Sequence, residues 1–183
     1  MHELRNESPI GSTEMACFAE ADKQSVETVA ILAELLAQSI LLRDLYKNVR
    51  LQTSQSQFQQ LHLVFEAHYK EQLHIVDVLI DRIRMLGGNG RVLASDFLKS
   101  TQPSCGPRVR GGPEQWVADL LDAHELVLNT AQPTASTSNH QWVREFAVGL
   151  VVLINDQQRM SLSEQRLSRT NQNRALRLAQ TEE

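Results

Sequence analysis

Residues Phe58–Gly88 read FQQLHLVFEAHYKEQLHIVDVLIDRIRMLGG and end in the pair Gly87-Gly88. At about 1.5 Å per residue, such a segment would form one helix about 45 Å long. The glycine pair is a typical end signal for a helix. Six apolar side chains recur at helical spacing and predict a face that packs against other elements: Phe58, Leu61, Phe65, Val76, Leu79 and Ile83.

A neighbouring face of this helix carries four potential metal ligands: His62, Glu66, Asp77 and Asp81. At about 100° per residue, all four fall within a stripe about 100° wide. The members of each pair, His62 with Glu66 and Asp77 with Asp81, are four residues apart and could bind one ion. The two pairs lie about 22 Å apart along the helix axis, so they cannot share a site within one chain.

The two pairs are, however, placed symmetrically about a point between Glu71 and Gln72. If two copies of the helix pack antiparallel about a two-fold axis at that point, His62 faces Asp81 of the partner subunit. Glu66 then faces Asp77 of the partner subunit. Because a two-fold interface is self-complementary, the pattern predicts two equivalent metal sites, each built from both subunits.

The flanking sequence predicts three further helices. A first helix is expected from Ser25 to about Tyr46, a third from Pro113 to Pro133, and a fourth from near Asn139. The segment Asn89–Gly112 is too long for a simple turn, and Leu93–Ser100 inside it could form a short helix. A bundle that runs up and down, crosses over, and runs up and down again needs such a connection. The fold class is therefore all-α, with a ferritin-like four-helix bundle over residues 25–167.

The two ends of the chain differ in charge. Residues 1–24 are expected to form a mobile, acidic N-terminal arm, and residues 168–183 a frayed C-terminal tail containing Arg169, Arg174 and Arg177. The net charge of −4 disfavours DNA binding, which would have to come from this tail. The sequence shows no long apolar run and no signal region, so we expect a cytoplasmic protein that does not contact a membrane. Cys17 and Cys105 match no zinc or redox spacing.

The pattern FxxLHxxFE, followed by DxxxDRIRxLGG, resembles the second-helix signature of the Dps mini-ferritins, the DNA-binding proteins from starved cells. LLDAHELVL and INDQQRMSL add weaker similarity, so the resemblance covers most of Ser25–Leu167. It implies a hollow spherical dodecamer of four-helix subunits in the bacterial cytosol or nucleoid. Such a shell oxidises Fe²⁺ with hydrogen peroxide in preference to O₂, stores the ferric iron and protects against oxidative stress.

Carried over residue by residue, the resemblance makes His62 and Glu66 of one subunit the iron ligands, together with Asp77 and Asp81 of the partner subunit. Glu66 stands where the family has Asp, and Asp81 where it has Glu; both keep the hard oxygen ligands that suit iron. Arg50 stands where the family has a histidine ligand, in the segment RLQTSQ instead of HWxVxG. A guanidinium has no lone pair to give. Arg50 could instead pair with Glu66 or with Asp77 of the partner subunit.

Two interpretations of the site therefore stay open. The first is an iron-storing ferroxidase whose activity Arg50 weakens. The second is a cage with a degenerate centre, which binds iron passively or is purely structural. Among the other histidines, Glu71-x-x-His74 is a chance match to a di-iron motif, and His68 is expected to pack in the core. His124 and His140 are expected to have surface or core roles.

Overall fold

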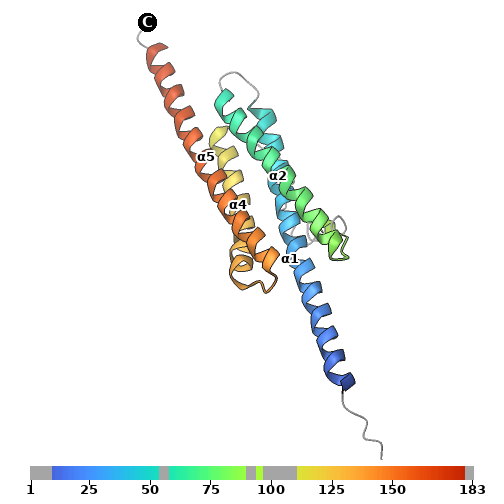
Figure 1. The fold of residues 1–183 in the computed structure, drawn as a ribbon. Helices are drawn as coiled ribbons and strands as arrows, with labels where there is room; N and C mark the ends of the chain where they lie inside the picture. Colours follow the sequence, from blue (N-terminus) through green and yellow to red (C-terminus); the bar gives the residue numbers. More distant parts are fainter. Residues whose placement is uncertain (1–9, 54–57, 90–93, 97–110, 180–183) are drawn as a thin grey trace, which may run out of the picture.

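Four long helices make up most of the structure, a computed structural model that describes residues 10–53, 58–89, 94–96 and 111–179. They are α1 (Ile10–Gln52), α2 (Gln59–Met85), α4 (Pro113–Thr137) and α5 (Gln141–Ala179). The helices lie side by side, and the first part of α1 and the last part of α5 project from opposite ends (Figure 1). Within the described ranges no strand is present, so the prediction of an all-α four-helix bundle is confirmed.

The connection between α2 and α4 sets the topology. Phe58, just before α2, contacts Trp116 in the first turn of α4 with ring centroids 5.7 Å apart, so α2 and α4 begin at the same end. Arg82, in the last turn of α2, stacks over Trp142 at the start of α5, 4.4 Å from the ring centroid. The helices therefore run up, down, down and up (Figure 1).

The long crossover was predicted correctly, whereas the expected upward direction of the third helix was wrong. Residues 94–96 of the crossover are helical, and the rest of the predicted Leu93–Ser100 helix lies outside the described residues.

Four helix limits differ from the sequence prediction. α1 ends at Gln52 instead of near Tyr46. α1 begins at Ile10 instead of Ser25, so residues 10–24 of the predicted arm are helical, while residues 1–9 are outside the described ranges. α4 continues through Pro133 to Thr137, because a single proline removes only one backbone donor and the Asn129 carbonyl opposite it is on an exposed residue. α5 continues to Ala179, so most of the predicted frayed tail is helical.

The end of α2 agrees with the prediction. Gly87 adopts a φ of +80°, which a side chain would disfavour. The Gly87 N–H donates to the Arg84 carbonyl and the Gly88 N–H to the Ile83 carbonyl, both at 2.9 Å. The glycine pair thus satisfies carbonyls of the last turn that would otherwise lack partners.

The core is built from aliphatic side chains of all four helices and of the crossover. On α1 the fully buried residues include Leu32, Leu35, Leu36, Leu42 and Tyr46. Contrary to the sequence expectation, the segment Ser25–Gln52 is long and apolar enough to cross a membrane by length and composition alone. Half of its most apolar window is buried inside the bundle, however, and a core helix passes the same test. Packing of α1 against α2 and α4 accounts for this hydropathy.

Candidate metal centre

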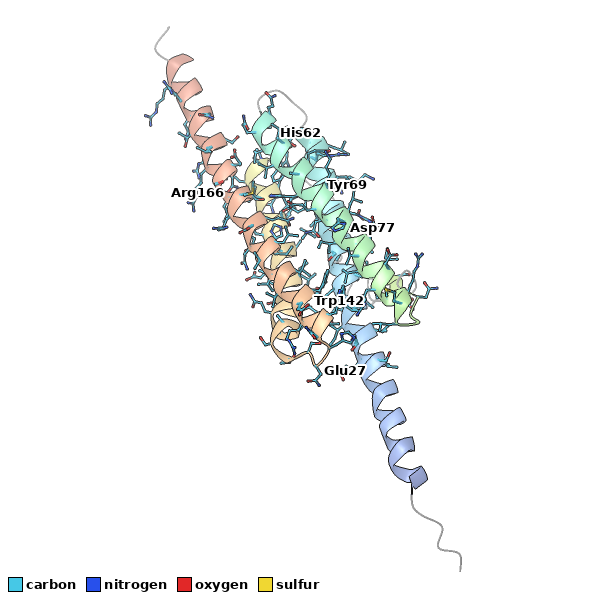
Figure 2. The ribbon with its side chains drawn as sticks, in the orientation of Figure 1. Glu27, His62, Tyr69, Asp77, Trp142 and Arg166 are labelled. Atoms are coloured by element: carbon cyan, nitrogen blue, oxygen red, sulfur yellow. The ribbon has the colours of Figure 1, made fainter. Side chains whose placement is uncertain are left out.

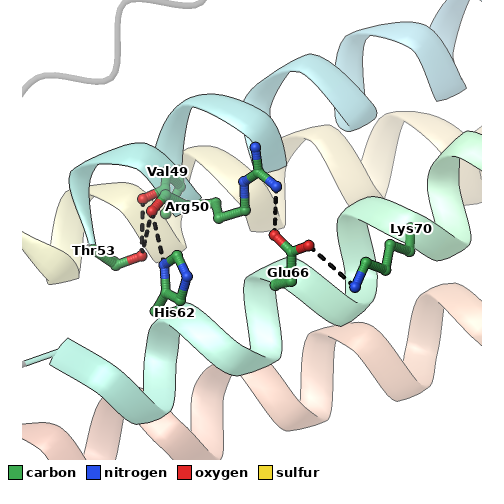
Figure 3. A network of polar contacts seen from close by, with 6 residues as sticks. All are labelled: Val49, Arg50, Thr53, His62, Glu66 and Lys70. Carbon is green, nitrogen blue, oxygen red and sulfur yellow. Dashed lines mark hydrogen bonds and ion pairs between the residues drawn. The ribbon is translucent and has the colours of Figure 1, made fainter.

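The Glu66 carboxylate is held by two cations. Arg50, from the last turn of α1, forms an ion pair with Oε2, and the Lys70 ammonium lies 3.2 Å from Oε1 (Figure 3). Both carboxylate oxygens are therefore already engaged. The hydrogen bonds from Arg50 and then from Lys70 hold the pKa of Glu66 below its usual value. Of the two acids that Arg50 was predicted to pair with, the structure shows Glu66.

Arg50 has a second contact, with an aromatic ring. Its guanidinium carbon lies 4.8 Å from the centroid of the Tyr69 ring, one turn from Glu66 on α2. Its side chain is 23% exposed, against 69% for Lys70. A guanidinium held by a carboxylate and an aromatic face is fixed in a way that a solvated lysine is not.

The ring of His62 is oriented by the end of α1. Its Nδ1 lies 3.0 Å from the Arg50 carbonyl oxygen, which can only accept a hydrogen bond. In the neutral ring Nδ1 therefore carries the proton, and Nε2 keeps the lone pair that a metal ion requires. The Thr53 hydroxyl donates to the Val49 and Arg50 carbonyls at 3.1 and 3.0 Å and supports this last turn (Figure 3).

Asp77 and Asp81 lie further along the same helix and are exposed; Figure 2 shows His62 and Asp77 on successive parts of α2. Asp81 pairs with Arg84 at 3.6 Å. In the described ranges, no three His, Cys, Asp or Glu side chains come close enough to hold a metal ion within one chain. The structure thus brings His62 and Glu66 together and leaves Asp77 and Asp81 apart from them. Completion of the site by a partner subunit stays a prediction.

A buried polar cluster inside the bundle was not predicted. The Tyr46 hydroxyl lies 2.7 Å from Nε2 of His124, and the Tyr46 and His68 rings meet edge to face at 5.2 Å. The Gln72 amide donates to Gln157 at 3.0 Å. The available sequence signal was the i,i+4 pair His68 and Gln72, two polar residues on the apolar face of α2. The other members of the cluster come from α1, α4 and α5, and sequence spacing cannot predict which residues of different helices meet.

Burial governs the ionisation of this cluster. It lowers the pKa of His68 to about 4. It also lowers the pKa of His124 to about 3, with a smaller contribution from the neighbouring His68. Burial likewise raises the pKa of the Tyr46 phenol. His68 was correctly expected to be a core residue, but neither of its ring nitrogens has a hydrogen-bond partner among the described residues.

His124 has a core position, and His140 is half-buried. Glu71 of the Glu71-x-x-His74 match accepts a hydrogen bond from Gln157 at 2.8 Å, and His74 is exposed. Among the described residues the match forms no group of three metal ligands.

Comparison with known proteins places these features in a family. A model of the ferritin-like domain matches residues 29–141. An uncharacterised protein from the bpoA2 5′ region of Kitasatospora aureofaciens is 34% identical over 108 residues, which cover 57% of this chain and 70% of the relative.

Two solved structures are similar in fold. DpsC from Streptomyces coelicolor has a TM-score of 0.53 and 24% identity, covering 81% of this chain and 85% of that one. Dps from Thermosynechococcus elongatus has a TM-score of 0.54 and 21% identity, covering 81% and 91%. The chain belongs to the ferritin-like family, and its fold is that of the Dps proteins.

Proposed function

We propose that this protein binds, oxidises and stores iron in a homo-oligomeric cage in the bacterial cytosol. The cage would be a twelve-subunit shell, and its sites would combine His62 and Glu66 of one subunit with Asp77 and Asp81 of the partner subunit. The observation that supports this most directly is the His62 ring, whose Nδ1 is held by the Arg50 carbonyl, so that Nε2 keeps its lone pair, one helical turn from Glu66 on α2. Metal-binding histidines are typically oriented in this way.

The outward face of α2 supports the two-fold arrangement. Leu63 is 55% exposed in the single chain, a large apolar side chain next to the ligand His62. In the antiparallel register that brings His62 to Asp81 of the partner subunit, Leu63 lies opposite Ile80 of the partner subunit. The same packing would therefore remove an apolar side chain from water and complete the ligand set.

The chemistry follows from the ligand types. Imidazole nitrogen and carboxylate oxygens are suitable ligands for Fe²⁺, which here is the substrate. Two Fe²⁺ ions give one electron each to hydrogen peroxide, which takes up two protons and leaves as two water molecules, with two Fe³⁺ ions formed. This overall stoichiometry consumes one peroxide molecule for two Fe²⁺ ions, and no hydroxyl radical is released when both electrons reach the same peroxide molecule.

The test is peroxide-driven oxidation of Fe²⁺, followed by the absorbance of the ferric product. We expect His62→Ala to lower the initial rate at least about tenfold, because the only imidazole ligand is lost. His74→Ala is the matched control, since His74 is exposed on the same helix but outside the ligand stripe. Equal rates for His62→Ala and the native chain would show that the site lies elsewhere.

A passive cage is the second candidate, favoured by the engagement of both Glu66 oxygens with cations. Arg50→His separates the two candidates, because it replaces the guanidinium by a ligand. If the native chain oxidises Fe²⁺ barely above background and Arg50→His raises the rate sharply, the protein is a passive cage.

DNA binding is not favoured by the net charge of −4, although α5 presents Arg166, Arg169, Arg174 and Arg177 on exposed positions. A gel shift at low salt, repeated at higher salt, tests it. Binding through these arginines would weaken steeply as salt rises.

A further inference from the structure

The charge around Glu66 is unusual for a site that must take up cations. Three carboxylates would face each site: Glu66 and, from the partner subunit, Asp77 and Asp81. Yet Oε2 of Glu66 is paired with Arg50 and Oε1 with Lys70, so each carboxylate oxygen already has a cationic partner. A metal ion that binds Glu66 must therefore share the carboxylate with Arg50 and Lys70 or displace one of them.

The two cations are not equally easy to displace. Lys70 is 69% exposed and reaches Glu66 from one turn further along α2, so water can replace the contact. Arg50 is 23% exposed and comes from a different helix, and its guanidinium also lies over the Tyr69 ring at 4.8 Å. Arg50 is thus held by a carboxylate on one side and by an aromatic face on the other.

We propose that Arg50 is a built-in cation of the inter-subunit site, so that each site takes one divalent metal ion and not two. This inference rests on the proposed function, because it concerns the same site. A guanidinium keeps its proton at every accessible pH and offers no lone pair, so it occupies space beside Glu66 without ligating. Its positive charge repels a second divalent ion that would share the Glu66 carboxylate. The one ion that binds is held by His62 and Glu66 of one subunit and by Asp77 and Asp81 of the partner subunit.

The proposal is tested by calorimetric titration of the intact oligomer with Co²⁺, a divalent ion that is not oxidised during the titration. We expect the native chain to bind one ion per site. Arg50→His adds a ligand as it removes the charge, and we expect it to bind two. Arg50→Gln removes the charge alone, and we expect its affinity to rise about tenfold or more. Lys70→Gln is the matched control: it removes one positive charge from the same carboxylate, but an exposed one, and we expect a change below about threefold.

A second pair of variants tests whether the Tyr69 ring holds Arg50 in place, without changing any charge. Tyr69→Leu removes the ring beneath Arg50, and Tyr69→Phe keeps it. If the ring holds Arg50 on Glu66, Tyr69→Leu binds Co²⁺ more tightly than the native chain by about threefold to tenfold, and Tyr69→Phe binds like the native chain. Gel filtration and circular dichroism of each variant establish that the oligomer is retained.

The titration distinguishes a failure of the role given to Arg50 from a failure of the proposed iron site. Two ions per site in the native chain, or equal affinities for the native chain, Arg50→Gln and Tyr69→Leu, would overturn the role of Arg50 and leave the proposed iron site standing. Absence of Co²⁺ binding in the native chain and in all the Arg50 variants would overturn the proposed site itself. A single ion per site whose affinity rises in Arg50→Gln but not in Lys70→Gln supports both.

Discussion

His68 and His124 are two buried histidines of the same polar cluster, but their bonding differs. In the part of the chain that the structure describes, neither ring nitrogen of His68 has a partner, whereas Nε2 of His124 lies 2.7 Å from the Tyr46 hydroxyl. An unpaired buried polar group costs about 1–3 kcal/mol, so we expect His68→Leu to raise the free energy of unfolding by about 1 kcal/mol. His124→Leu should lower it by about 1–3 kcal/mol, because the Tyr46 hydroxyl loses its partner on α4. Urea unfolding at pH 7 measures both, and destabilisation by His68→Leu would show that a water molecule satisfies that ring.

The same two histidines make stability depend on pH. In the unfolded chain a histidine binds a proton below about pH 6.5. In the folded chain burial lowers the pKa of His68 to about 4 and that of His124 to about 3. Between these values the unfolded chain binds more protons, so the contribution to stability is complete above about pH 6.5 and decreases as the pH falls toward 4 and 3.

We therefore expect the urea midpoint to fall between pH 7 and pH 5, at constant protein concentration. The fall should be smaller in His68→Leu, which has one titrating group fewer. An equal fall in both chains would place the titration elsewhere. Ordinary carboxyl groups titrate at lower pH and contribute little in this window.

At the scale of the element, a glycine just after a helix and a glycine inside a helix have opposite roles. A Cβ on Gly88 would lie 2.7 Å from Cγ2 of Ile83 and 3.0 Å from Cγ1 of Val29, so Gly88 lets the end of α2 approach α1. Gly149 lies inside α5, where a Cβ would meet nothing within 4 Å. We expect Gly88→Ala to destabilise the protein by about 1–3 kcal/mol, because tightly packed side chains must shift. Gly149→Ala should stabilise it by up to about 1 kcal/mol, because alanine is the better helix former.

Thermal unfolding of the two variants checks this pair of predictions. If Gly88→Ala is neutral, Ile83 can move without cost. If Gly149→Ala is destabilising, the exposed face of α5 around it is covered by another subunit, because the added methyl group would then clash at that interface.

At the scale of the whole molecule, assembly depends on the outward face of α2. Leu63 is 55% exposed, and the proposed two-fold packing covers it. We expect Leu63→Arg to dissociate the oligomer, because a charged side chain would have to lose its water opposite the apolar Ile80 of the partner subunit. Val26→Arg is the control, since Val26 is 71% exposed on α1. Sedimentation velocity measures both, and an unchanged oligomer in Leu63→Arg would exclude α2 as the two-fold interface.

Several features could be predicted from the sequence because their causes are local. The apolar repeat of Phe58–Gly88 specifies a helix by its own period, and the Gly87-Gly88 pair ends it through backbone hydrogen bonds a few residues long. That Arg50 cannot ligate a metal ion follows from the guanidinium itself. The ends of α1, α4 and α5 were predicted less well, because capping signals and a single proline weigh little against favourable helix propensity on either side.

Only the tertiary structure decided which side chains from different helices meet. It paired Arg50 of α1 with Glu66 of α2, placed the guanidinium over Tyr69, and turned Nδ1 of His62 toward the Arg50 carbonyl. It also gathered Tyr46, His68 and His124 from three helices and made α4 parallel to α2. Helical periodicity fixes which face a residue occupies, but the rotation, direction and depth at which two helices pack depend on all the side chains between them.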